Sequence, residues 1–145
     1  MQVNIEPLAP ELEATIRKKL AANPFIKFVG IKAPQLGKGY ARFLLPFKPE
    51  LANTIGLMQG GVIAALADEA VAYALYSLVP EGETFNTVEM KINFLAAVKP
   101  EKEAVEAVAW IAKRGRTISL GEAVVRQGDR LVAKAMCTYI HLVKK

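Results

Sequence analysis

Residues 59–79, QGGVIAALADEAVAYALYSLV, are the stretch of sequence that decides the fold. Alanine is abundant in it and apolar residues occupy nearly every helical face, which predicts a long central helix. The pair Gly60-Gly61 begins this helix, and Pro80-Glu81-Gly82 stops it. A helix that is apolar almost all round must be wrapped by other elements or by a partner chain.

The chain after this helix has the pattern of β structure. Residues 88, 90, 92 and 94 are apolar and alternate with Thr87, Glu89, Lys91 and Asn93, a period of two. Three more runs of strand length follow at residues 102–112, 116–126 and 130–143, and Gln127-Gly128-Asp129 is a hairpin signal. We expect these four strands to form a meander.

The chain before the central helix predicts one helix and two strands. Residues 7–22 have leucine or isoleucine at every fourth position and end at Asn23-Pro24, which is typical of an amphipathic helix. Residues 26–33 and 39–46 resemble two strands on either side of a turn-rich segment. Residues 1–145 are therefore expected to form a single α+β domain. Its antiparallel, curved β-sheet would wrap around the long central helix, as in the hotdog fold.

Composition excludes several classes of function. The net charge of +5 favours anionic partners, but the basic residues are scattered without the aromatic platform that single-stranded nucleic acid uses. We therefore expect no nucleic-acid partner, and a small phosphorylated ligand fits at least as well. No apolar run reaches the roughly 20 residues of a membrane span, and the first residues lack a signal pattern. The single cysteine, Cys137, suits a cytoplasmic protein.

The single histidine, His141, restricts the chemistry further. Histidine-rich metal sites, HExxH motifs and cysteine-based zinc sites cannot be built from this chain, so no metal and no cofactor are expected. Any Ser-His dyad would have to use His141, close to the end of the sequence. The chemistry must come from carboxylates, amides, hydroxyls and backbone N–H groups.

Residues 53–68, NTIGLMQGGVIAALAD, resemble the PaaI-like branch of hotdog acyl-CoA thioesterases. That family shows Asn, Gly, His-Gly-Gly and then an apolar stretch that ends in Leu-Ala-Asp. Three later segments also resemble the family, so the similarity covers roughly residues 25–143: TVEMKINF at 87–94, Arg114-Gly115-Arg116, and DRLVAKA at 129–135. One departure is that Gln59 stands in place of the family's histidine; a glutamine can orient a carbonyl or a water but cannot carry a proton.

The resemblance implies hydrolysis of an acyl-CoA thioester to a carboxylic acid and CoA. It makes Asp68 the general base or nucleophile and the Gly60 N–H the main donor to the developing oxyanion. The residues around Asp68 in the expected helix are mostly small and apolar. A carboxylate in such surroundings is either desolvated or paired with a donor. Glu69 points about 100° away and is expected to be structural.

The spacing of these two groups predicts a dimer. Gly60 and Asp68 are eight residues apart, about 12 Å along a helix, which is too far for one carbonyl to meet both. If both act on one thioester, they come from two chains with antiparallel central helices. We expect a homodimer, or a homotetramer of two dimers.

The remaining candidates have an ordinary explanation beside the functional one. The resemblance implies that Asn53 helps to hold the thioester or a water, but an asparagine here can also simply form a turn. The resemblance likewise implies that Thr87 orients the water, although threonine is also a common strand residue. The other candidates for substrate binding are Gly61, Met58, Arg114 and Arg116, where the arginines would meet CoA phosphates or be solvated turn charges. Tyr73 and Tyr76 would line an acyl pocket or pack in the core.

Two other functions compete with hydrolysis. A non-catalytic hotdog protein that binds acyl-CoA as a sensor or regulator is the alternative that Gln59 keeps open. A hotdog dehydratase or hydratase ranks last, because it relies on a His–Asp pair and His141 is far from any such motif.

Overall fold

The computed structural model describes residues 4–101 and 103–143. Its elements, in chain order, are α1 (Pro10–Ala22), α2 (Pro24–Val29), β1 (Lys32–Gly37), β2 (Tyr40–Leu45), the 3₁₀ helix η1 (Pro49–Leu51), α3 (Gly60–Tyr76), β3 (Glu83–Phe94), β4 (Val105–Arg114), β5 (Ile118–Gln127) and β6 (Arg130–Val143).

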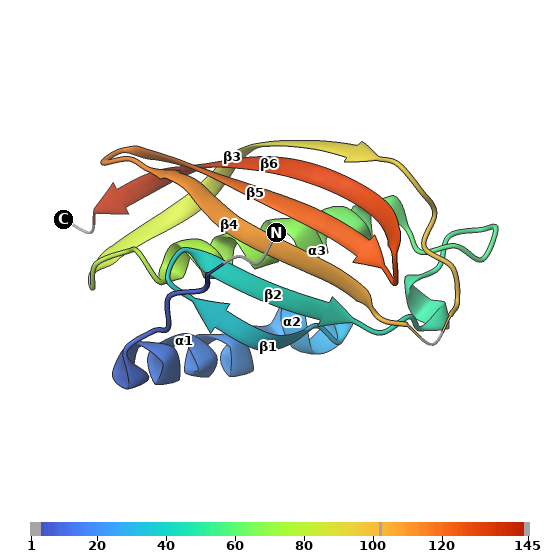
Figure 1. The fold of residues 1–145 in the computed structure, drawn as a ribbon, viewed down its shortest axis with the longest axis horizontal. Helices are drawn as coiled ribbons and strands as arrows, with labels where there is room; N and C mark the ends of the chain where they lie inside the picture. The colour runs from blue at the N-terminus through green and yellow to red at the C-terminus, as the bar shows by residue number, and fades with distance from the viewer. Residues whose placement is uncertain (1–3, 102, 144–145) are drawn as a thin grey trace.

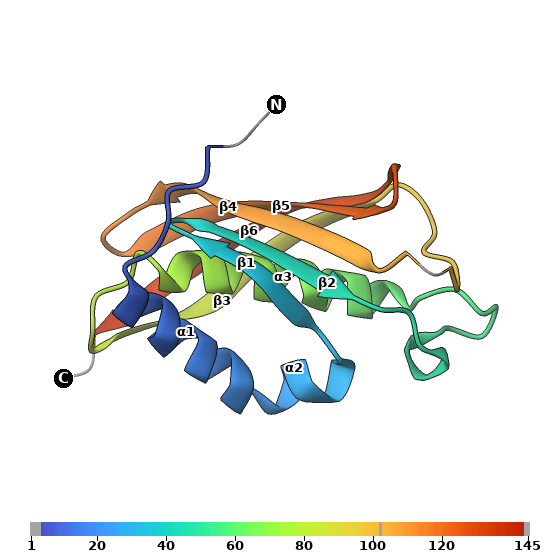
Figure 2. The same cartoon turned by 60° about the horizontal axis from the view of Figure 1, so that its bottom comes forward.

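One antiparallel sheet of six strands curves around α3, with the strand order β1-β2-β4-β5-β6-β3 (Figure 1). Figure 2 shows α3 between this sheet and the two shorter helices, α1 and α2. The almost continuous apolar character of α3 follows from this position, because its buried residues are Ile63, Leu66, Ala67, Ala70, Val71, Tyr73, Ala74 and Leu75. The expected α+β hotdog architecture is confirmed.

The sheet approaches α3 very closely at Gly121 of β5. A Cβ atom at this position would lie 2.2 Å from Val71 Cγ1 and 3.2 Å from Ile111 Cδ1. Only a residue without a side chain allows helix and sheet to approach this closely.

The segment after α1 corrects one sequence-based prediction. A strand was expected at residues 26–33, but residues 24–29 form α2. The Asn23 side chain caps this helix by accepting hydrogen bonds from Phe25 N (3.0 Å) and Ile26 N (3.2 Å), and Pro24 occupies a first-turn position. Gly30, with φ of 90°, ends it. The first strand begins only at Lys32 and includes residues that were expected to form a turn.

The strands after α3 correct a second prediction. Only β4, β5 and β6 form a meander, since β3 pairs with β6 at one edge of the sheet and β4 pairs with β2. In the β3–β6 register, Thr87 lies opposite Tyr139 and Glu89 opposite Thr138, which leaves Val88 as an extra, bulged residue.

The bulge changes which face of β3 carries Thr87. Strict alternation would place Thr87 with Glu89 on one face and Met90 on the other. Thr87 instead faces α3, as does Met90, which packs against the core. The alternation predicted for this strand is therefore wrong at Thr87, because an inserted residue exchanges the faces to which the side chains before and after it point.

No helix in the described part of the chain is both long and apolar enough to cross a membrane.

Candidate active site

The Asp68 carboxylate is held by two hydroxyl groups from the sheet. Tyr139 of β6 donates to Asp68 Oδ1 at 2.6 Å, and Thr87 of β3 donates to the same oxygen at 3.0 Å. Within the described residues, Asp68 Oδ2 has only the longer Thr87 contact, at 3.3 Å. A hydroxyl has one hydrogen to donate, so both donors are assigned to Oδ1, and Oδ2 is left for other partners.

The two donors face Asp68 because of the β3–β6 pairing. Thr87 and Tyr139 are directly opposite each other, and the Val88 bulge follows immediately. Bulges are frequent beside active sites, where they redirect a side chain. The resemblance identified Asp68 and Thr87, but it assigned no part to Tyr139.

Tyr139 is a permanent donor at this position. Its side chain is 1% exposed, and burial followed by the Asp68 charge raises the pKa of its phenol well above the ordinary value. The phenol therefore keeps its hydrogen at any pH at which the protein works.

A cavity of about 190 Å³ lies beside the carboxylate. Mostly aromatic and polar side chains from α3, β3 and β6, together with Asn23, surround it: Asn23, Asp68, Glu69, Ala72, Tyr73, Tyr76, Phe85, Asn86, Thr87 and Tyr139. Tyr73 and Tyr76, which were candidates for an acyl pocket, thus lie in the same cavity wall as Asp68.

Glu69, which was expected to be structural, also lines this cavity. Burial, and then the neighbouring Asp68 charge, raise the pKa of Glu69 to about 7. The cavity therefore contains one carboxylate that is held by hydroxyl donors and a second carboxyl group, Glu69, that is protonated more readily than an exposed glutamate.

The N-terminus of α3 forms a second part of the candidate site. Gln59 is the N-cap residue, and the amides of Gly60 and Gly61 donate to no acceptor within residues 4–101 and 103–143. A Cβ atom on Gly61 would meet nothing within 4 Å, and one on Gly60 would make only ordinary contact with Phe94, at 3.5 Å. Packing within the chain thus does not require either glycine, and their free N–H groups remain available to an anionic group.

Asn53 and Gln59 share a hollow of about 520 Å³ next to this helix start. Asn53 Oδ1 accepts hydrogen bonds from Ile55 N and Leu57 N, both at 3.1 Å, so this oxygen shapes the loop. The predicted residues therefore fall into two groups in one chain. Asn53 and Gln59 lie at the start of α3, and Asp68 and Thr87 lie at the other cavity.

Three further candidates line neither of these hollows. Met58 is 3% exposed and lies in the core. The Arg114 guanidinium lies 2.6 Å from Glu83 Oε1, in an ion pair within the chain. Arg116 is exposed.

A Ser-His-Glu arrangement exists elsewhere in the sheet. Ser119 Oγ lies 2.7 Å from His141 Nε2, and His141 Nδ1 lies 2.6 Å from Glu83 Oε1. Burial and the Arg114 charge lower the pKa of His141, which keeps the imidazole neutral at pH 7. Ser119 is only 1% exposed, so no substrate carbonyl can reach its hydroxyl, and the arrangement is a buried polar network.

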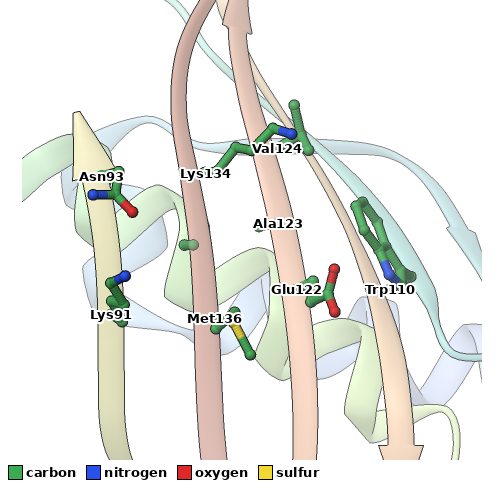
Figure 3. Close-up of a pocket in the computed structure, with 9 residues that line it drawn as sticks. Lys91, Asn93, Trp110, Glu122, Ala123, Val124, Lys134 and Met136 are labelled. Carbon is green, nitrogen blue, oxygen red and sulfur yellow. The ribbon is translucent and has the colours of Figure 1, made fainter. Parts of the chain in front are cut away.

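The outer face of the sheet has a separate hollow of about 250 Å³. Figure 3 shows its side chains on the side of the strands away from α3, among them Lys91, Asn93, Trp110, Glu122, Lys134 and Met136. The sheet separates this hollow from Asp68. No group of three or more metal-ligating side chains is found in the described residues.

Comparison with known proteins identifies a family and several similar proteins. The family model of the thioesterase superfamily matches residues 55–134. A thioesterase family protein from Silicibacter pomeroyi has 28% sequence identity and a TM-score of 0.84, over 92% of this chain and 99% of that chain. A conserved protein from Pseudomonas aeruginosa has 36% identity and a TM-score of 0.78, over 83% of this chain and 94% of that chain.

The PaaI protein from the phenylacetic acid degradation operon of Escherichia coli has a TM-score of 0.83 over 93% of this chain and 96% of that chain. At 20% identity this likeness shows the fold alone. The family match confirms the resemblance to thioesterases drawn from the sequence, and the PaaI neighbour agrees with it in fold.

Proposed function

The chain belongs to the thioesterase superfamily, and from that premise we propose that it hydrolyses acyl-CoA thioesters to a carboxylic acid and CoA. Thioester hydrolysis in general follows from the family. The acyl-CoA substrate and the roles of individual residues are proposed here. The observation that carries the proposal is the Asp68 carboxylate, which is fixed through Oδ1 and leaves Oδ2 for a reactant in the adjoining cavity.

Asp68 Oδ2 acts on the thioester carbonyl in one of two ways. As a general base it takes a proton from a water whose oxygen attacks the carbonyl carbon. As a nucleophile it attacks that carbon itself, and water then hydrolyses the mixed anhydride. In both routes the C–S bond breaks, and the CoA thiolate leaves and is protonated.

The N–H groups at the start of α3 stabilise the oxyanion formed in this attack. The Gly60 N–H is the main donor, and Gly61 lets the substrate approach closely. Asn53 and Gln59, which share a hollow beside these amides, help to hold the thioester carbonyl or the water. Arg116, as the exposed arginine of its turn, is better placed than the paired Arg114 to meet the CoA phosphates.

The site is formed by two copies of the chain. Gly60 and Asp68 lie eight residues apart in the continuous helix α3, about 12 Å along its axis. The edge position of β3 supports a dimer, because an edge strand has free backbone groups and can pair with a second copy. Val88, Phe94 and Leu95, at or next to this edge, are more than half exposed and would be covered in such a pairing. Two dimers can combine further into a tetramer.

The central test is substitution of the carboxylate. We expect Asp68→Ala to lower hydrolysis about 10²–10⁴-fold across a panel of acyl-CoA thioesters, measured by detection of the released thiol. Binding of acyl-CoA, measured by calorimetry, should persist. Asp129→Asn removes a carboxylate from the exposed β5–β6 turn and is the control. If the wild-type protein binds acyl-CoA without hydrolysing any member of the panel, the protein is a sensor or regulator instead.

The amide donor can be removed without changing the helix. Proline is tolerated at the first position of a helix, and the preceding Gln59 already has φ −59° and ψ 133°, in the region favoured before proline. We expect Gly60→Pro to lower the rate about 10²–10³-fold, since it removes one oxyanion donor. Gly60→Ala keeps the N–H and should lose much less activity. Equal losses in the two variants would contradict the role of this amide.

A further inference from the structure

The hydroxyl donors on Asp68 distinguish its two carboxylate oxygens, and Tyr139 has the closest contacts with this residue. Tyr139 makes the shortest bond to this carboxylate, 2.6 Å to Oδ1, and its hydroxyl also lies 2.9 Å from the Asp68 backbone oxygen. A single phenol thus contacts both the side chain and the backbone of the same residue.

The position of the phenol is itself fixed. Tyr139 lies within β6, is 1% exposed, and packs edge-on against Phe85 with ring centroids 5.5 Å apart. A buried side chain in such packing has little freedom to move, so its hydroxyl group is a rigid reference point for Asp68. Thr87, the second donor, is exposed and makes the longer bond.

We propose that Tyr139 is a positioning residue that fixes Asp68 Oδ1 and thereby presents Oδ2 to the thioester. This inference rests on the proposed function of Asp68. Tyr139 itself touches no reacting atom. It acts by holding the carboxylate in one rotamer, since a reactive group that is misplaced by about 1 Å can lose a hundredfold in rate.

The proposal predicts that Tyr139→Phe lowers kcat and leaves KM unchanged. Loss of a hydrogen bond to a charged group corresponds to a fall of about ten- to a hundredfold in kcat. Tyr40→Phe is the matched control, because Tyr40 is also a buried strand tyrosine but does not line the cavity of Asp68. It should retain the wild-type kcat and KM.

A double variant separates positioning from a general structural role. If Tyr139 acts through Asp68, then Asp68→Ala/Tyr139→Phe has the same residual rate as Asp68→Ala alone. If the phenol merely maintains the fold, Tyr139→Phe lowers the rate by a similar factor in both backgrounds, and the proposal is overturned. Thr87→Val removes the exposed donor without touching the core, and it should give a smaller fall in kcat that is also absent in the Asp68→Ala background.

The outcomes also separate this inference from the proposed function. If Asp68→Ala leaves hydrolysis intact, the proposed function fails. If Asp68→Ala abolishes hydrolysis but Tyr139→Phe keeps kcat within about twofold of the wild type, the function stands and the positioning role fails.

Discussion

Neighbouring residues Asp68 and Glu69 show how one cavity can give two carboxyl groups different properties. Asp68 accepts hydrogen bonds from Tyr139 and Thr87. Burial and the Asp68 charge raise the pKa of Glu69 to about 7. Near neutral pH, Glu69 therefore takes up a proton that an exposed glutamate would have released.

Glu69 should make the stability of the protein depend on pH. Because its folded pKa is above the reference value of 4.5, the folded state binds more protons than the unfolded state between about pH 4.5 and 7. The contribution of Glu69 to the free energy of unfolding is therefore fully present below pH 4.5 and is lost as the pH rises through 7. We expect Glu69→Gln to be about 1–2 kcal/mol more stable than the wild type at pH 8, a value reduced for partial solvent screening, and equally stable near pH 4.5.

Urea denaturation at several pH values measures this difference. Glu81→Gln, at an exposed turn, is the control and should follow the wild type throughout. A stability difference for Glu69→Gln that is the same at pH 4.5 and pH 8 would show that the effect does not come from titration of this carboxyl group.

The residues of the site differ in how far the sequence could predict them. Asp68 and Gly60 stand at positions where a family motif marks them. Tyr139 has no such signal, because it lies 71 positions from Asp68 and an isolated tyrosine in a strand is ordinary. The role proposed for it can be argued only once the β3–β6 register is known, and a one-residue shift in that register would turn its hydroxyl to the other face.

The secondary-structure elements show the same contrast between local and long-range information. The composition of residues 59–79 correctly predicts α3, because nearly all the determinants of a buried helix are local. α2 is missed because its six residues include bulky apolar side chains that also suit a strand, and the Asn23 cap outweighs that preference. The Val88 bulge is missed because Val88 continues an apparently regular alternation.

Contact between α3 and β5 can be tested at Gly121. A methyl group there would lie 2.2 Å from Val71 Cγ1, so we expect Gly121→Ala to destabilise the protein by about 1–3 kcal/mol in chemical denaturation. Val71→Ala removes the opposing atom and is itself expected to destabilise by leaving a cavity.

The two changes should compensate when they are combined. Gly121→Ala/Val71→Ala is expected to be more stable than the sum of the two single effects predicts, because the new methyl group fills the space that was vacated. Strict additivity would mean that Gly121 and Val71 are not in contact in solution.

At the scale of the whole molecule, the active site that we propose to be shared between two copies predicts complementation between two inactive variants. When Asp68→Ala and Gly60→Pro subunits are refolded together in equal amounts, half of the dimers are mixed. Each mixed dimer has one intact site of its two. The mixture should therefore recover about one quarter of the wild-type activity.

A mixture of Asp68→Ala and Asp68→Asn is the control, since every site in it lacks the carboxylate and no activity should return. No recovery in the first mixture, with dimers shown by sedimentation, would place both groups in one chain or separate them from a common substrate. A purified protein that sediments as a monomer would contradict the shared site directly.

The pairing of β3 with β6 has a consequence for biosynthesis. Because β3 pairs with β6, which follows it only after β4 and β5, a growing polypeptide carries β3 without its neighbour until residues 130–143 have left the ribosome. Thr87 and Tyr139 then come to face each other in a single late step, and Asp68 gains its rigid support at that moment. Nascent chains that stop short of β6 would carry the helix and most of the sheet, yet the support proposed for Asp68 would form only after β6 has emerged.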